Sequence, residues 1–117
     1  MATEPIRLEE LQCRSAGWRA LRLSGDLTMR TLFPFQEAVR ADQAVILVLD
    51  LSGVAFVDSV GIGALVGAYV SRQKDGRKVA LVGVGERVNA SLSILGLTRL
   101  IPTFETFEAA EAHPSLR

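Results

Sequence analysis

Residues 44–73, AVILVLDLSGVAFVDSVGIGALVGAYVSRQ, contain the pattern that decides the fold. The first part, residues 44–51, is a continuous apolar run rich in Val, Ile and Leu, which is typical of a central strand covered on both faces. A loop then passes through Gly53, and a helix over residues 59–73 follows Asp58. A buried strand that leads into a helix predicts a parallel crossover, and therefore an α/β protein.

Further strands and helices are predicted on both sides of this unit. Strands are expected over residues 8–13, 18–24, 78–84 and 100–104. Helices are expected over residues 27–41, 87–95 and 106–112. Together they predict a single α/β domain over residues 1–117, with a mixed four- to five-stranded sheet, mostly parallel in its centre, and about four helices packed against it.

Local signals refine these boundaries. Ser15-Ala16-Gly17 reads as a tight turn, so the first two strands are expected to form an antiparallel hairpin. Pro34 is tolerated only in the first turn of a helix, so the regular part of that helix should begin near Thr31 or Leu32. Gly96 is the expected stop of the helix over residues 87–95. In the last helix, Phe107 and Ala110 are spaced to pack inward.

Asp58 and Ser59 stand where the second predicted helix begins. The Asp58 carboxylate can accept the free N–H groups of the first turn, so Asp58 is the expected N-cap and Ser59 the first helical residue. The Ser59 hydroxyl would then lie at the positive end of the helix, where an added phosphate of about −1.5 to −2 charge can be held. A simple helix cap explains the same two residues without any function.

Three glycines in this helix, Gly61, Gly63 and Gly67, each cost up to about 1 kcal/mol relative to Ala. For Gly61 and Gly63 two interpretations stand side by side: close approach of a partner protein, or tight packing of the helix on its own sheet. For Gly67 the sequence favours packing.

Composition excludes several classes of protein. Thirteen basic and thirteen acidic residues cancel, so no basic excess points to nucleic acid. No apolar run is long enough for a membrane span, and the charged start of the chain lacks a secretory signal, so a cytoplasmic location is expected. Cys13 and His113 are single and far apart, which argues against a Cys/His nucleophile pair and against a zinc site. No cofactor is expected. Cys13 is expected to be buried in a strand and His113 to be solvated.

The motif over residues 50–63, with Asp-Leu-Ser followed by FVDSVGIG, resembles the signature of the STAS domain family, and most closely its bacterial anti-sigma factor antagonist branch. Leu23-Ser24-Gly25-Asp26-Leu27 is similar to the Gly-Glu-Leu-Asp of that family. The pattern from Leu92 to Leu97, followed by Ile101, Phe104 and Phe107, is similar to the C-terminal part of the family. These matches follow the family order over almost the whole chain.

The resemblance implies a switch without enzymatic activity of its own. The unphosphorylated protein would bind an anti-sigma factor that is also a serine kinase, and so release a sigma factor. The kinase would phosphorylate Ser59, which ends binding, and a PP2C-type phosphatase would reverse this. The partner-binding residues implied by the resemblance are Asp26, Thr28, Asp58, Ser59, Val60, Gly61, Ile62 and Gly63.

The chain departs from the family pattern at two of these positions. Val60 stands where the family usually has Ser or Thr, which removes a second phosphorylation site. Thr28 stands where the family has Asp, which removes a carboxylate near Ser59.

Other functions fit parts of the pattern. One is a non-switching STAS scaffold in a stress-sensing or lipid-transport complex. Another is a nucleotide-dependent enzyme, because Gly61, Gly63 and Gly67 superficially fit a dinucleotide-binding glycine pattern, although no catalytic group accompanies them. A third is self-association through an exposed Phe33 or Phe35.

Overall fold

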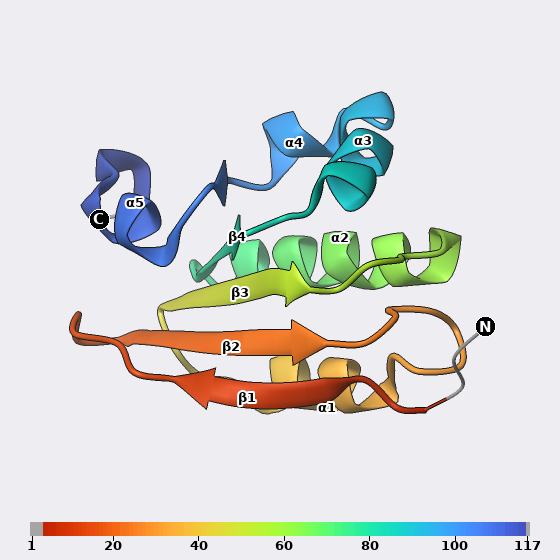
Figure 1. The fold of residues 1–117 in the computed structure, drawn as a ribbon. Helices are drawn as coiled ribbons and strands as arrows, with labels where there is room; N and C mark the ends of the chain where they lie inside the picture. Colours follow the sequence, from red (N-terminus) through yellow and green to blue (C-terminus); the bar gives the residue numbers. More distant parts are fainter. Residues whose placement is uncertain (1–3, 117) are drawn as a thin grey trace.

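A five-stranded mixed sheet forms the centre of the computed structural model, which describes residues 4–116 (Figure 1). The strands are β1 (Arg7–Leu11), β2 (Trp18–Ser24), β3 (Ile46–Gly53), β4 (Lys78–Val82) and β5 (Thr103–Phe104), and they lie in that order across the sheet. β1 pairs with β2 in antiparallel fashion, and every other pair is parallel. The predicted hairpin and the mostly parallel centre are therefore confirmed.

The helices cover both faces of the sheet. They are α1 (Phe33–Ala41), α2 (Ser59–Lys74), α3 (Glu86–Ile94), α4 (Leu97–Leu100) and α5 (Phe107–Ala112), followed by a short 3-10 turn over Pro114–Leu116. Buried residues of α1, α2 and α3 share one core with the sheet, whereas Ala110 of α5 and Leu116 share a second core with its other face. The predicted inward packing of Phe107 and Ala110 is confirmed, and the Phe107 ring meets Trp18 edge-on at 6.4 Å.

The central strand β3 explains why the apolar run is continuous. Leu47, Leu49 and Leu51 point into the core under α1 and α2, and Ile46 and Val48 point into the core under α5. Successive side chains of a strand alternate between faces, so a strand covered on both sides needs apolar residues at nearly every position.

Two helix predictions need correction. The outer bound at residue 27 is wrong, because Leu27 is held in an extended bridge to Val57 and its N–H donates to the carbonyl of Phe56 at 3.0 Å. The start near Thr31 or Leu32 that Pro34 indicated is confirmed, since Leu32 is the N-cap and α1 begins at Phe33. Gly96 ends α3 as expected, with φ at +73°, but the chain then makes the short helix α4, which the sequence did not predict.

The ends of the sheet also differ from expectation. β1 stops at Leu11, so Cys13 lies beyond the strand and is half-buried instead of buried. Burial, with Glu111 and Glu10 nearby, raises the pKa of its thiol. His113 is exposed as expected, although its ring packs against Phe104.

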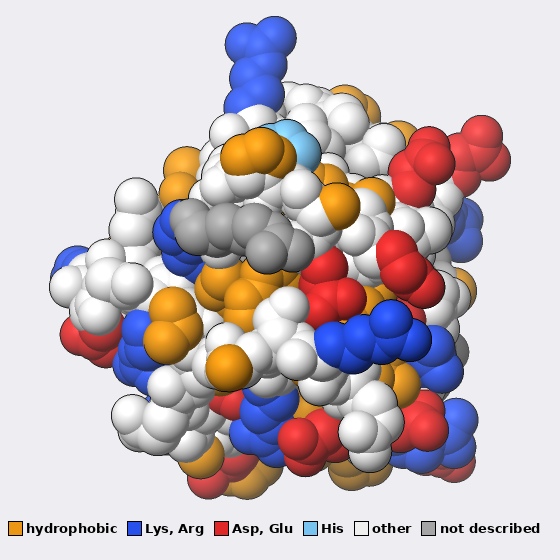
Figure 2. All heavy atoms as spheres, turned by 90° about the vertical axis from the view of Figure 1, so that its left-hand side faces the viewer, with side chains coloured by type: hydrophobic (Ala, Val, Ile, Leu, Met, Phe, Trp, Pro, Cys, Tyr) orange, Lys and Arg blue, Asp and Glu red, His pale blue; other side chains and the backbone are white. Residues whose placement is uncertain are grey.

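Charge is dispersed over the surface on the side of the β1–β2 turn and the C-terminus. Figure 2 shows that face, and acidic and basic side chains alternate there with smaller hydrophobic areas between them. Among residues 4–116, no helix is both long and apolar enough to cross a bilayer.

Candidate functional site

Asp58 joins two segments at the start of α2. One carboxylate oxygen, Oδ1, accepts the N–H of Gly61 at 2.7 Å, and the other, Oδ2, accepts the N–H of Met29 at 3.1 Å. The first bond caps α2, as the sequence predicted. The second ties the helix to the turn that follows β2, so a single carboxylate fixes both sides of the site.

Ser59 is the first residue of α2 and is exposed to solvent. The first turn, Ser-Val-Gly-Ile, carries no charge of its own, so the positive end of the helix dipole meets only the Asp58 carboxylate. The Ser59 side chain therefore lies on the surface at the positive end of the helix, next to the Asp58 carboxylate that caps it.

The fold leaves no room for a side chain at Gly61. A Cβ on Gly61 would lie 2.1 Å from the carbonyl oxygen of Leu27, far inside any real contact. The same carbonyl accepts the N–H of Asp58 at 3.2 Å, so it is held in place. Packing, not partner approach, therefore explains this glycine.

At Gly63 and Gly67, by contrast, the fold leaves room for a side chain. Both are exposed, and apart from their own helix no atom lies within 4 Å of a Cβ built on either residue. The packing explanation expected for Gly67 is wrong, because α2 turns that side of the helix away from the sheet. Packing also fails to explain Gly63.

Asp26 and Thr28 shape the turn opposite Ser59. Asp26 is half-buried, and its carbonyl accepts the hydroxyl of Thr31 at 2.6 Å. Thr28 is only 2% exposed, and its hydroxyl lies 3.3 Å from that of Thr31. This burial corrects the expectation that Thr28 touches a partner: its side chain holds the turn and is not on the surface.

Two exposed apolar residues at the end of the molecule where α1 and α2 begin (Figure 1) were missed or left open by sequence reasoning. Met29 is 68% exposed, directly beside the Asp58 carboxylate that its N–H binds. Phe33, the first residue of α1, is 67% exposed, whereas Phe35 is buried. With Val60, at 44%, they place apolar surface on three segments at this end of the molecule. Met29 fell inside the helix predicted over residues 27–41, so no sequence signal indicated that it would lie exposed in a turn.

The geometry also bears on the nucleotide-dependent enzyme alternative and on metal binding. In a phosphate-binding turn the first N–H groups of the helix face the ligand, but here Gly61 already donates to Asp58. In the described part of the chain, His, Cys, Asp and Glu form no group of three or more placed to hold a metal ion.

The fold and the site define a small α/β module with an exposed serine at a capped helix start. A model of the STAS domain matches residues 14–110. The chain belongs to the STAS domain family.

Relatives and solved structures that are similar to this chain include anti-sigma factor antagonists. The chain is 30% identical over 89 residues to the anti-sigma F factor antagonist of Paenibacillus polymyxa, covering 73% of this chain and 76% of that one. It matches the crystal structure of an anti-sigma factor antagonist from Mycobacterium paratuberculosis with a TM-score of 0.82 at 26% identity, over 99% and 97% of the two chains. The phosphorylated form of the Bacillus cell fate determinant SpoIIAA matches with a TM-score of 0.65 at 17% identity, over 91% and 96%, which shows the fold alone.

Proposed function

We propose that this protein is an anti-sigma factor antagonist whose binding is switched by phosphorylation of Ser59. The unphosphorylated form binds an anti-sigma factor with serine kinase activity in the cytoplasm and releases a sigma factor. Phosphorylation of Ser59 ends this binding, and a PP2C-type phosphatase restores it. The observation that carries the proposal is the exposed Ser59 hydroxyl at the start of α2, beside the Asp58 cap.

The protein contributes a nucleophile and a contact surface, and no catalytic machinery. The Ser59 oxygen attacks the γ-phosphorus of ATP held by the kinase, the bond to ADP breaks, and the hydroxyl proton passes to a base of the kinase. Asp58 positions the helix end that presents the hydroxyl, because its two bonds hold Gly61 and Met29.

Phosphate would act on binding through charge and desolvation. It adds about −1.5 to −2 charge at the end of the molecule that also exposes the apolar side chains of Met29, Phe33 and Val60. The adjacent Asp58 carboxylate repels it, so the anion at the helix end is only partly compensated. Covering such a group in an interface costs several kcal/mol, and a loss of about 3 kcal/mol weakens binding roughly a hundredfold.

Co-purification of the tagged protein from its source cell, followed by mass spectrometry, tests this function. We expect an anti-sigma factor of the serine kinase type in the complex and phosphate on Ser59 in the unbound fraction. With that kinase and ATP, Ser59→Ala should incorporate no phosphate, whereas Ser93→Ala, at an exposed serine of α3, should be modified as the wild type is. A bound partner with no phosphate at Ser59 under any growth condition would instead support a non-switching scaffold.

A further inference from the structure

The turn between β2 and α1, residues 26–32, has an inverted distribution of polar and apolar side chains. Thr28 and Thr31 are buried, whereas Met29 and Phe33, the residue that follows the turn, are 68% and 67% exposed. Soluble proteins place threonine mostly on the surface and large apolar side chains mostly inside, so the reversed order is informative. The turn uses its polar groups to hold its own backbone and presents apolar groups to the solvent.

Hydrogen bonds fix this turn from beneath. The Thr31 hydroxyl donates to the carbonyl of Asp26 at 2.6 Å and accepts the N–H of Thr28 at 2.9 Å. The N–H of Met29 donates to the Asp58 carboxylate at 3.1 Å. The exposed side chains therefore stand on a backbone that is already ordered, so a partner that binds them loses little free energy in ordering the turn.

Arg30 adds an available positive charge to the same turn. It is exposed, and its own N–H donates to the Thr28 hydroxyl at 3.3 Å. Within residues 4–116, no Asp or Glu forms an ion pair with its guanidinium. Met, Phe and Arg are the residue types that are enriched in protein interfaces, and arginine pairs well with a carboxylate. The turn is therefore suited to a partner surface that is apolar and carries a negative charge.

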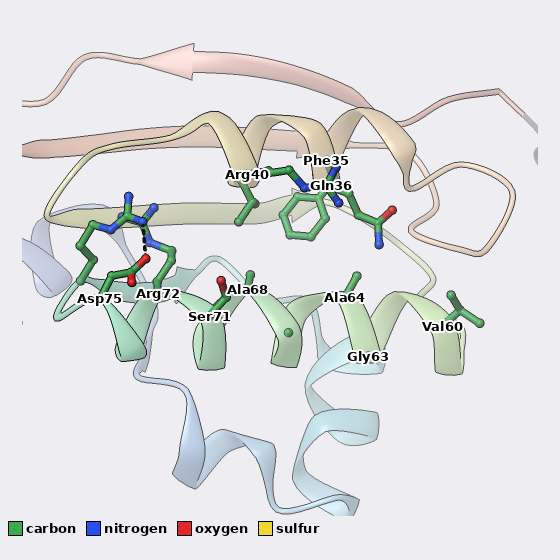
Figure 3. A pocket seen from close by; sticks show the side chains of 13 residues that line it. Phe35, Gln36, Arg40, Val60, Gly63, Ala64, Ala68, Ser71, Arg72 and Asp75 are labelled. Atoms are coloured by element: carbon green, nitrogen blue, oxygen red, sulfur yellow. Dashed lines mark hydrogen bonds and ion pairs between the residues drawn. The ribbon is translucent and has the colours of Figure 1, made fainter.

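The turn adjoins the start of α2. The Asp58 carboxylate binds the N–H of Met29 and also caps the helix that begins at Ser59, so one side chain joins the two surfaces. Val60 is exposed on the first turn of α2, and Figure 3 shows its side chain pointing toward the side on which α1 lies. A partner seated over Ser59 therefore lies next to the turn.

We propose that Met29, Arg30 and Phe33 are the residues with which this protein recognises its anti-sigma factor, which offers an apolar pocket with a carboxylate at its rim. The inference rests on the proposed function. It moves the contacts of the turn from Asp26 and Thr28, which the resemblance implied, to their exposed neighbours. It also separates two tasks, because the turn selects the partner and the phosphorylation site ends the binding.

Calorimetric titration of the anti-sigma factor recovered by co-purification into full-length variants tests the turn. Met29→Ser and Phe33→Ser should each bind at least about tenfold more weakly. Arg30→Ala should bind about fivefold more weakly, and its affinity should depend less on salt. Ile94→Ser and Arg99→Ala, at exposed positions of α3 and α4, are the matched controls and should bind as the wild type does. All five variants should unfold at the urea concentration of the wild type, because every replaced side chain is exposed.

The kinetics of phosphorylation distinguish recognition by the turn from positioning of Ser59. Met29→Ser keeps the backbone N–H that binds Asp58, so the start of α2 stays in place. With the kinase and ATP, this variant should show a higher KM for phosphorylation of Ser59 and a kcat near that of the wild type. A lower kcat at an unchanged KM would show that the turn only positions Ser59, and would overturn the inference.

The remaining outcomes separate this inference from the proposed function. Wild-type affinity in all three turn variants overturns the inference and leaves the function standing. Weaker binding confined to Ile94→Ser and Arg99→Ala does the same, because it would place the contact on α3 and α4. Failure of the wild type to bind the anti-sigma factor overturns both. Sedimentation of the free protein covers another occupant, because a wild-type dimer that Phe33→Ser dissociates would assign the turn to a second copy of this chain and overturn the inference.

Discussion

At the scale of single residues, Asp58 has two structural roles that the sequence only half reveals. The cap of α2 follows from an acidic residue in front of a helical pattern, and it was predicted. The bond to Met29 depends on a residue far away in the chain, and no local pattern encodes it. The presentation of Ser59 therefore depends on the turn after β2 as much as on α2 itself.

Replacement of Asp58 tests this double role. Asp58→Ala should lower the free energy of unfolding by about 1–2 kcal/mol, because the N–H groups of Gly61 and Met29 lose their acceptor. Asp58→Asn keeps an acceptor oxygen for only one of these two N–H groups and places its NH2 group toward the other, so its stability should lie between those of the wild type and Asp58→Ala. Urea unfolding followed by circular dichroism measures both, and equal stability of Asp58→Ala and the wild type would show that the cap is dispensable.

The two neighbouring glycines give opposite expectations for the same substitution. Gly61→Ala should destabilise the protein by about 1–3 kcal/mol, because its methyl group would overlap the Leu27 carbonyl. Gly63→Ala should stabilise it by up to about 1 kcal/mol, since the added methyl group points into open space. Thermal unfolding of the two variants measures this difference. Midpoints that shift in the same direction for both variants would contradict it.

At the scale of elements, the strongest sequence patterns were the most reliable. The apolar run predicted β3, and the Asp58 signal fixed the first residue of α2. Pro34 indicated the start of α1 to within two residues, whereas the outer bound at residue 27 was wrong because the pairing of Leu27 with Val57 overrides local helix propensity. Helix α4 was missed because four residues are too few for a periodic signal.

A cross-strand ion pair between β2 and β3 predicts how stability depends on pH. Burial by itself would raise the pKa of Asp50, but hydrogen bonds from Ser52 and Arg22 hold it below its ordinary value of 3.8. Asp50 then binds a proton less readily folded than unfolded, so its contribution is present above pH 3.8 and is lost as pH falls through the lower folded pKa.

The urea midpoint of the wild type should therefore fall more steeply from about pH 4 downward than that of Asp50→Asn, which has no proton to gain at this position. Glu105→Gln, at an exposed position beside the short strand β5, serves as the control and should follow the wild type. Parallel curves for the wild type and Asp50→Asn would rule out a role for this carboxylate.

At the scale of the whole molecule, Asp42 connects elements that are distant in sequence. One carboxylate oxygen pairs with Arg72 of α2 at 3.0 Å, and the other pairs with Arg19 of β2 at 2.9 Å. The carbonyl of Asp42 accepts a further bond from Arg77 at 2.6 Å, just before β4. Burial lowers the pKa of Arg72, and the Asp42 charge opposes that effect. Sequence reasoning missed this network because a buried arginine on α2 reads as a surface residue until its partner is known.

Asp42→Asn should destabilise the protein by about 3–5 kcal/mol, because it leaves the guanidinium of Arg72 buried without a counter-charge. The matched control is Glu37→Gln, which removes an exposed pair with Arg40 and should change stability by less than about 1 kcal/mol. Urea unfolding at neutral pH measures the two variants, and similar small effects for both would contradict a structural role for the Asp42 network.

The central claim is that one phosphate at the start of α2 turns partner binding off. The most direct measurement compares the affinity of the anti-sigma factor for the unmodified protein with its affinity for the protein carrying phosphoserine at position 59. The account predicts tight binding of the unmodified form and binding weaker by about a hundredfold or more for the phosphorylated form. Equal affinity of the two forms, with the fold intact in both, would contradict it.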